Sequence, residues 1–167
     1  DHWVIEPEVR PDIAAYLTHW CATHLEGYTG LFNAETIGGS IIEAHLRFAD
    51  QWPDLYGKGW VEALVGLYAR GRWQFAAAAK PGWSVILFGR HGRSFRAPSS
   101  DDVARIRAMP SVSSVQITFR PDQPIASHAA PPGGVRLGII NAFDLDQGRA
   151  ARSALARLFP AGDLVNG

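Results

Sequence analysis

Apolar positions in the first third of the chain first recur at intervals of three and four residues and then alternate with polar positions. The helical interval predicts a helix over residues 12–26. Two alternating runs follow, over 31–37 and 41–48, and they flank a Gly-Gly-Ser turn at 38–40. Because glycine tolerates the positive φ of a tight turn, these runs predict a β-hairpin.

The helical interval returns over residues 61–70, and the alanine-rich piece 73–79 either extends that helix or begins a strand. From Pro81 onward the pattern favours strands. We expect a strand, a tight turn at His91-Gly92 and a second strand over 83–98, a short helix over 99–110 with Ser99 or Ser100 as its N-cap, a strand over 112–119, a loop over 121–134, a strand over 135–143 and a helix over 146–159.

This order of elements predicts an α+β fold, with an antiparallel sheet and flanking helices. A hydrophobic content of 47% over 167 residues is enough for a core. Sixteen basic residues balance sixteen acidic ones, so no global field attracts nucleic acid or an anionic membrane. The single cysteine, Cys21, excludes an intrachain disulfide. No apolar stretch approaches the roughly 20 residues of a membrane span. We therefore expect a cytoplasmic protein without nucleic-acid or membrane partners.

Candidate chemistry lies within the expected hairpin. If the turn contains the three residues 38–40, Glu35 faces Glu43 directly across the two strands. Because strand side chains alternate between faces, His45 and Arg47 then share the face of the two glutamates. A two-residue turn would instead place Glu35 and Glu43 on opposite faces.

Two carboxylates that oppose each other destabilise a strand pair by roughly 0.2–1 kcal/mol, so a compensating charge is expected. A divalent cation such as Mg²⁺ or Mn²⁺ favours carboxylate oxygens and leaves positions for phosphate oxygens. Arg47 would then bind a phosphate through two parallel hydrogen bonds. The alternative is a solvated strand face whose surface ion pairs contribute little stability. The pattern alone leaves both interpretations open.

The succession of a helix, "GYTGLFNAE", a hairpin and "IIEAHLR" resembles the closing part of the ATP-grasp fold. The metal-binding signature of that family has a Glu or Asp on one strand and Glu-x-Asn-x-Arg on the next. Glu35 matches the first acidic ligand, Glu43 matches the second, and Arg47 matches the arginine. His45 stands at the position of the asparagine, which is a departure from the family pattern.

The resemblance implies ATP-dependent ligation of a small-molecule carboxylate to an amine or thiol. In this reaction the carboxylate attacks the γ-phosphate of ATP, and the nucleophile captures the resulting acyl phosphate. The implied cofactors are ATP and Mg²⁺ or Mn²⁺. The implied metal ligands are Glu35, Glu43 and His45. Arg47 and His45 would have catalytic roles, and Glu35, Glu43 and Arg47 would hold the nucleotide phosphates.

The resemblance covers residues 12–70 well and 82–159 loosely. It implies an ATP-grasp C-terminal subdomain over 1–80 and a β-rich α+β extension over 81–167. ATP-grasp enzymes also clamp the nucleotide with an upstream subdomain that supplies lysines and a glycine-rich loop, whereas this chain has two lysines and no such loop. We therefore expect the C-terminal portion of a longer ligase, partnered by the missing N-terminal ATP-grasp subdomains and inactive on its own.

Two further points remain open from the sequence. The alternative function is a non-catalytic binding or scaffold domain with a charged strand face, and the oligomeric state is undetermined, a homo-oligomer included.

The turn-rich stretch after the signature offers Asp50, Trp52, Asp54 and Tyr56 as candidates for a substrate pocket. Trp52 and Tyr56 would alternatively close the hydrophobic core.

Overall fold

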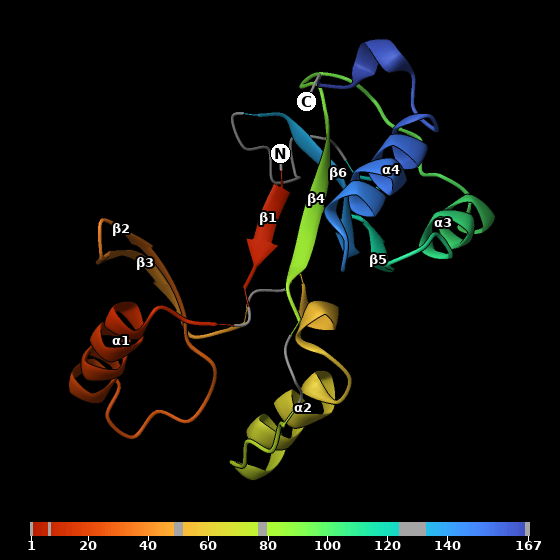
Figure 1. The fold of residues 1–167 in the computed structure, drawn as a ribbon. Helices are drawn as coiled ribbons and strands as arrows, with labels where there is room; N and C mark the ends of the chain where they lie inside the picture. The colour runs from red at the N-terminus through yellow and green to blue at the C-terminus, as the bar shows by residue number, and fades with distance from the viewer. Residues whose placement is uncertain (1, 7, 49–51, 77–79, 124–132, 166–167) are drawn as a thin grey trace. The chain divides into compact units, whose positions relative to one another are not determined.

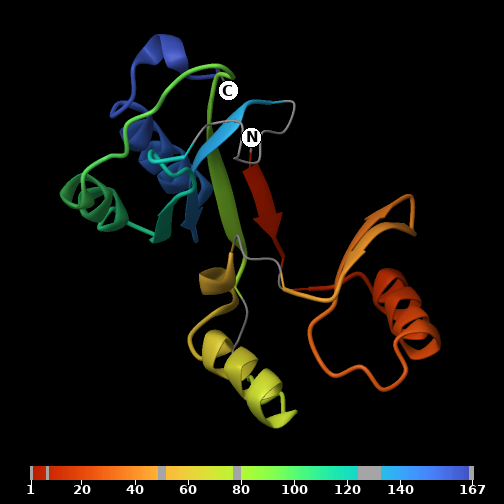
Figure 2. The ribbon, with the colours of Figure 1, turned by 180° about the vertical axis from the view of Figure 1, so that it is seen from behind.

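A computed structural model describes residues 2–6, 8–48, 52–76, 80–123 and 133–165. The chain divides into two compact units (Figures 1 and 2). We call Glu6–Lys80 the hairpin unit, and Asp1–Ile5 together with Pro81–Gly167 the sheet unit. Every strand pair that the described residues form is antiparallel, and helices flank the larger sheet, so the fold is α+β.

The sheet unit is built on a four-stranded sheet with the strand order β1-β4-β6-β5. Two helices pack on this sheet, α4 against β4 and β6 and α3 against β5 (Figure 1). The central strands β4 and β6 are buried over most of their length, which explains their nearly continuous apolar sequences. The elements are β1 (His2–Ile5), β4 (Gly82–Gly89), α3 (Ser100–Arg107), β5 (Val112–Ile117), β6 (Val135–Ala142), α4 (Leu145–Ala156) and a 3₁₀ turn at Ala161–Asp163.

The core of the sheet unit lies between the sheet and its two helices. Leu87 of β4 and Leu155 of α4 are at most 1% exposed there. Three phenylalanines, Phe95, Phe119 and Phe159, meet edge to face with ring centroids 6.0–6.1 Å apart. Edge-to-face contacts of this kind stabilise a core beyond the burial of apolar area alone. This packing fixes the two helices on the sheet.

The expected hairpin over 83–98 is wrong in its second strand. The chain turns at His91-Gly92 as expected, with a φ of +73° at Gly92. β1 pairs only with Gly82–Val85, at the other end of β4. Next to the turn, Gly89 forms a bridge with Leu164, the oxygen of Phe88 accepts a hydrogen bond from the backbone N–H of Val165, and β6 pairs with β4 as far as Gly89, so this end of β4 is already paired. The segment after the turn instead carries Phe95 into the core.

The hydrophobic pattern does not predict β1, because four residues are too few to show a clear alternation. Its pairing with β4 runs from His2 opposite Val85 to Ile5 opposite Gly82. This strand belongs to the sheet unit, whereas the sequence grouped these residues with the rest of 1–80. The run Trp-Val-Ile at residues 3–5 consists of residues with high strand propensity. This propensity is the sequence signal from which β1 could have been predicted.

The hairpin unit contains two helices, a 3₁₀ turn and a two-stranded sheet. Helix α2 buries Trp60, Ala63 and Leu67 and ends at Gly71, whose φ is +65°. Residues 72–76 form neither helix nor strand, and 77–79 lie outside the described residues. The elements are α1 (Pro11–His24), β2 (Asn33–Ile37), β3 (Ser40–His45), the 3₁₀ turn Pro53–Tyr56 and α2 (Trp60–Arg70).

None of the helices that the structure describes is long and apolar enough to cross a membrane. The longest of them, α1, has 14 residues and no fully buried side chain. Most of the expected loop over 121–134 falls on residues 124–132, which lie outside the described part of the chain.

The substitution Ser99→Ala tests the N-cap of α3. The Ser99 hydroxyl accepts a hydrogen bond from the backbone N–H of Asp102 at 3.2 Å, and this donor has no partner within the helix. We expect the free energy of unfolding, measured by urea denaturation, to fall by about 1 kcal/mol. The matched control Ser100→Ala lies one residue further on and should change it by less than about 0.5 kcal/mol. Equal losses in the two variants would contradict this assignment.

Candidate functional site

The β2–β3 hairpin places Glu35 directly opposite Glu43. The turn between the strands differs from the expected one, because it has the two residues Gly38 and Gly39 instead of three. Both glycines have positive φ values, +59° and +84°, as a type I′ turn requires. Continued without interruption, a two-residue turn would leave the two glutamates out of register and on opposite faces.

A β-bulge restores the alignment. Thr36 pairs with Ile41 and Glu35 pairs with Glu43, so Ile42 is an extra residue on β3 between these two pairs. The expected facing of Glu35 and Glu43 is therefore confirmed, while the expected three-residue turn is wrong. Two differences from the expected hairpin, the shorter turn and the bulge, compensate each other.

His45 contacts one of the two carboxylates. Its Nε2 lies 2.7 Å from Oε1 of Glu43, and the side chains of Glu43 and His45 are 53% and 32% exposed. The contact orients the imidazole toward Glu43. The described residues contain no group of three or more His, Cys, Asp or Glu side chains arranged as metal ligands. A metal set of Glu35, Glu43 and His45 thus stays a prediction, and the opposed carboxylate pair is its structural basis.

Arg47 lies beyond the end of β3, which the structure places at His45. The alternation of strand side chains therefore does not extend to Arg47, contrary to the expectation. The guanidinium is exposed, and its Nη1 donates a hydrogen bond to the backbone oxygen of Phe48 at 3.2 Å. Arg47 follows the strand of the carboxylate pair, and its other guanidinium donors have no recorded partner within the described residues.

A cavity of about 420 Å³ lies beside β2 in the hairpin unit. Trp52 and Tyr56 line it, as one of the two sequence interpretations expected, and Asp54 does not, while Asp50 lies outside the described residues. Nε1 of Trp52 donates a hydrogen bond to Oη of Tyr56 at 2.9 Å. The aromatic lining comes from six residues, which are Phe32, Phe48, Trp52, Tyr56, Trp60 and Trp73.

The phenol of Tyr56 stays protonated in this cavity. Burial raises its pKa above the ordinary value, and the hydrogen bond from Trp52 offsets only part of this effect. Asn33 and Ala34 of β2 also line the cavity, immediately before Glu35. Phe48, Trp52, Tyr56 and Trp60 recur every four residues, a spacing that the sequence analysis did not use. The rest of the lining, including Phe32, Asn33 and Trp73, comes from other segments, so the sequence did not predict the cavity as a whole.

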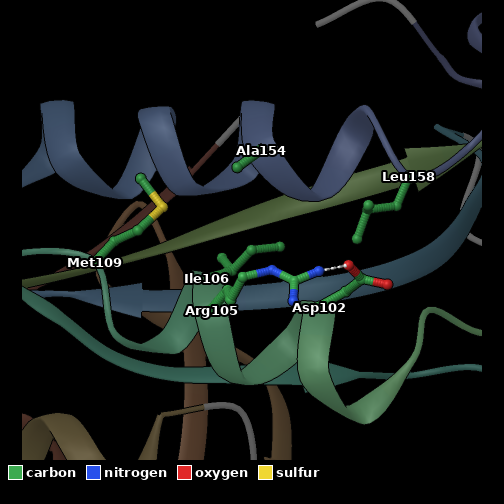
Figure 3. A pocket seen from close by; sticks show the side chains of 6 residues that line it. All are labelled: Asp102, Arg105, Ile106, Met109, Ala154 and Leu158. Carbon is green, nitrogen blue, oxygen red and sulfur yellow. Dashed lines mark hydrogen bonds and ion pairs between the residues drawn. The ribbon is translucent and has the colours of Figure 1, made fainter.

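A second cavity, of about 340 Å³, lies between α3 and α4 of the sheet unit (Figure 3). The apolar side chains of Met109 and Leu158 line it, and Arg105 points toward the carboxylate of Asp102. The hydroxyl of Ser99 donates a hydrogen bond to the same carboxylate, and this bond is the main reason that the pKa of Asp102 is lowered. The charged groups at this cavity therefore neutralise each other.

Comparison with family models, with curated proteins and with solved structures gives no match to this chain. The ATP-grasp resemblance stays a proposal that rests on the signature residues and on their geometry.

The substitution Glu35→Gln tests whether the two carboxylates repel each other. It removes one charge of the opposed pair and leaves the contact between Glu43 and His45 intact. Without divalent cations, we expect the free energy of unfolding to rise by about 0.5 kcal/mol, and high salt should reduce this gain by screening. The control Glu26→Gln removes an exposed charge elsewhere in the same unit and should have no such effect. A loss of stability in Glu35→Gln would show that the pair does not repel.

Proposed function

We propose that this chain is the C-terminal part of an ATP-dependent carboxylate–amine ligase of the ATP-grasp type. In this proposal the β2–β3 hairpin holds the phosphates of ATP through a divalent cation. The observation that supports it best is the bulge in β3, which brings Glu35 opposite Glu43 after a turn that would otherwise separate them. Two opposed carboxylates destabilise a hairpin, so their alignment indicates a role other than stability.

The donor atoms of this pair fit a hard cation. Mg²⁺ is usually bound by one or two carboxylates and completes its coordination with water and substrate phosphate oxygens, so Glu35 and Glu43 suffice without a third protein ligand. Glu35 is exposed and Glu43 is half exposed, which leaves both carboxylates accessible to a nucleotide. When bound, the cation would supply charge stabilisation for the transferred phosphoryl group.

The other side chains of the hairpin have separate roles in this proposal. Arg47 is permanently charged, and its guanidinium donors beyond the bond to Phe48 would bind phosphate oxygens of the nucleotide or of the acyl phosphate. His45 would orient the carboxylate of Glu43 through the contact at 2.7 Å. The substrate carboxylate oxygen attacks the γ-phosphorus, ADP leaves, and the amine then displaces phosphate from the acyl group.

A non-catalytic binding or scaffold domain is the second candidate function. The observation in its favour is the contact between Glu43 and His45, which gives one of the two carboxylates a partner within the chain. In that case the charged strand face would contact solvent or a protein partner, and its charges would contribute little to stability.

Thermal melting of the full chain with Mg²⁺ and a non-hydrolysable ATP analogue distinguishes the two candidates. A ligand that binds only the folded state raises the melting temperature, by an amount set by its concentration relative to Kd. We expect a rise for the native chain and no rise for the double variant Glu35→Gln, Glu43→Gln. Arg47→Ala should lose the part of the rise that requires the nucleotide and keep the part that Mg²⁺ alone produces.

Glu26→Gln is the matched control for this experiment and should retain the full rise. If the native chain shows no rise while Glu43→Gln is as stable as the native chain or more stable, the ligase proposal is wrong and the scaffold proposal is favoured. The chain alone should not turn over ATP in either case, because the proposal assigns the nucleotide clamp to upstream subdomains.

A further inference from the structure

The cavity beside β2 offers aromatic rings in two orientations. Tyr56 and Trp60 stack with centroids 4.7 Å apart and planes 22° apart. Trp73 and Phe48 instead meet Trp60 edge-on, at 78° and 66°. A flat aromatic ring in the cavity could therefore stack on one wall and meet another edge to face, which are the two preferred geometries of aromatic pairs. The volume of about 420 Å³ is in the range of small-molecule sites.

The lining also restricts the charge of a ligand. No described residue that lines the cavity carries a formal charge. An anionic group that entered it would lose hydration without gaining a cationic partner from the lining, which is unfavourable, whereas a cation would gain contacts with the faces of the aromatic rings. The part of a ligand inside the cavity should therefore carry no negative charge.

One side chain in the lining is available for polar recognition. The Trp52 indole and the Tyr56 phenol already bond to each other. The side-chain amide of Asn33 has no recorded hydrogen bond in the described part of the chain, and it offers both a donor and an acceptor. Its backbone is held in β2 opposite His45, so the amide projects from a regular strand.

We infer that this cavity binds a planar aromatic ring that has no negative charge and carries an adjacent hydrogen-bond donor and acceptor, as in an aromatic carboxamide. The ring would stack against the tryptophan and tyrosine walls, and Asn33 would pair with the donor and the acceptor. Binding of the ring requires neither ATP nor a cation. We further suggest that the ring belongs to the substrate of the ligase, because Asn33 of the cavity and Glu35 of the carboxylate pair lie on the same strand. Only this suggestion rests on the proposed function.

Three matched probes test this inference by isothermal titration calorimetry with the full chain, without nucleotide or metal. Benzamide is neutral, aromatic and carries the amide, and we expect a Kd in the millimolar range for so small a ligand. Cyclohexanecarboxamide keeps the amide but has a saturated ring, and should bind at least about fivefold more weakly because it cannot stack. Benzoate keeps the ring but is charged, and should also bind more weakly.

Substitutions locate the binding. Trp73→Ala removes a wall residue that is 42% exposed, so the chain should still fold, and we expect benzamide to bind about fivefold more weakly. Asn33→Leu should weaken it about tenfold by removing the amide partner. Tyr16→Ala removes a partly exposed aromatic ring that does not line the cavity, and it should leave Kd unchanged.

Three outcomes would overturn the inference. One is the absence of saturable benzamide binding in the tens of millimolar by a native chain that melts cooperatively. Another is binding that Trp73→Ala and Asn33→Leu both leave unchanged. Neither outcome bears on the ATP proposal, because neither nucleotide nor cation is present. Equal affinities for benzamide and cyclohexanecarboxamide would likewise contradict a site selected by aromatic stacking.

Discussion

The register between β2 and β3 determines which side chains the hairpin places opposite each other. A tight Gly38-Gly39 turn sets the first pairs, and the extra residue Ile42 then shifts β3 by one position, so that Glu35 and Glu43 stand opposite each other. A shift of one residue moves side chains to the other face of a sheet. Without the bulge, Glu35 and Glu43 would not oppose each other. The proposed cation would then have no pair of carboxylates to bind.

Strand β2 is held at its start by contacts on the backbone just before it. The Tyr28 hydroxyl donates to the carbonyl oxygen of Leu31 at 3.0 Å and lies 3.3 Å from that of Leu46, and the Tyr68 hydroxyl accepts from the backbone N–H of Leu31 at 3.2 Å. These bonds connect both strands of the hairpin to neighbouring segments. The cavity and the carboxylate pair therefore lie on one restrained strand, with Asn33 at its beginning and Glu35 at its middle.

The sequence predicted elements with strong periodicity and failed where tertiary context decides. Helix α2 and strands β4 and β6 are found as expected, because their apolar patterns are long. The segment after Gly92 has strand-like composition, yet it forms no strand, because the C-terminal segment at Leu164 and Val165 already pairs with the end of β4 next to the turn. The facing of the two glutamates was predicted from a three-residue turn that the structure does not have, and the bulge that produces it instead has no signature in the sequence. The aromatic cavity depends on segments that only folding brings together.

Anomalous diffraction at the manganese edge, from crystals of the full chain grown with Mn²⁺ and a non-hydrolysable ATP analogue, tests the central claim most directly. The account predicts an anomalous peak within coordination distance of carboxylate oxygens from both Glu35 and Glu43, with phosphate oxygens on its open side. An ordered hairpin with no peak between these carboxylates, or with manganese bound only elsewhere, would contradict it.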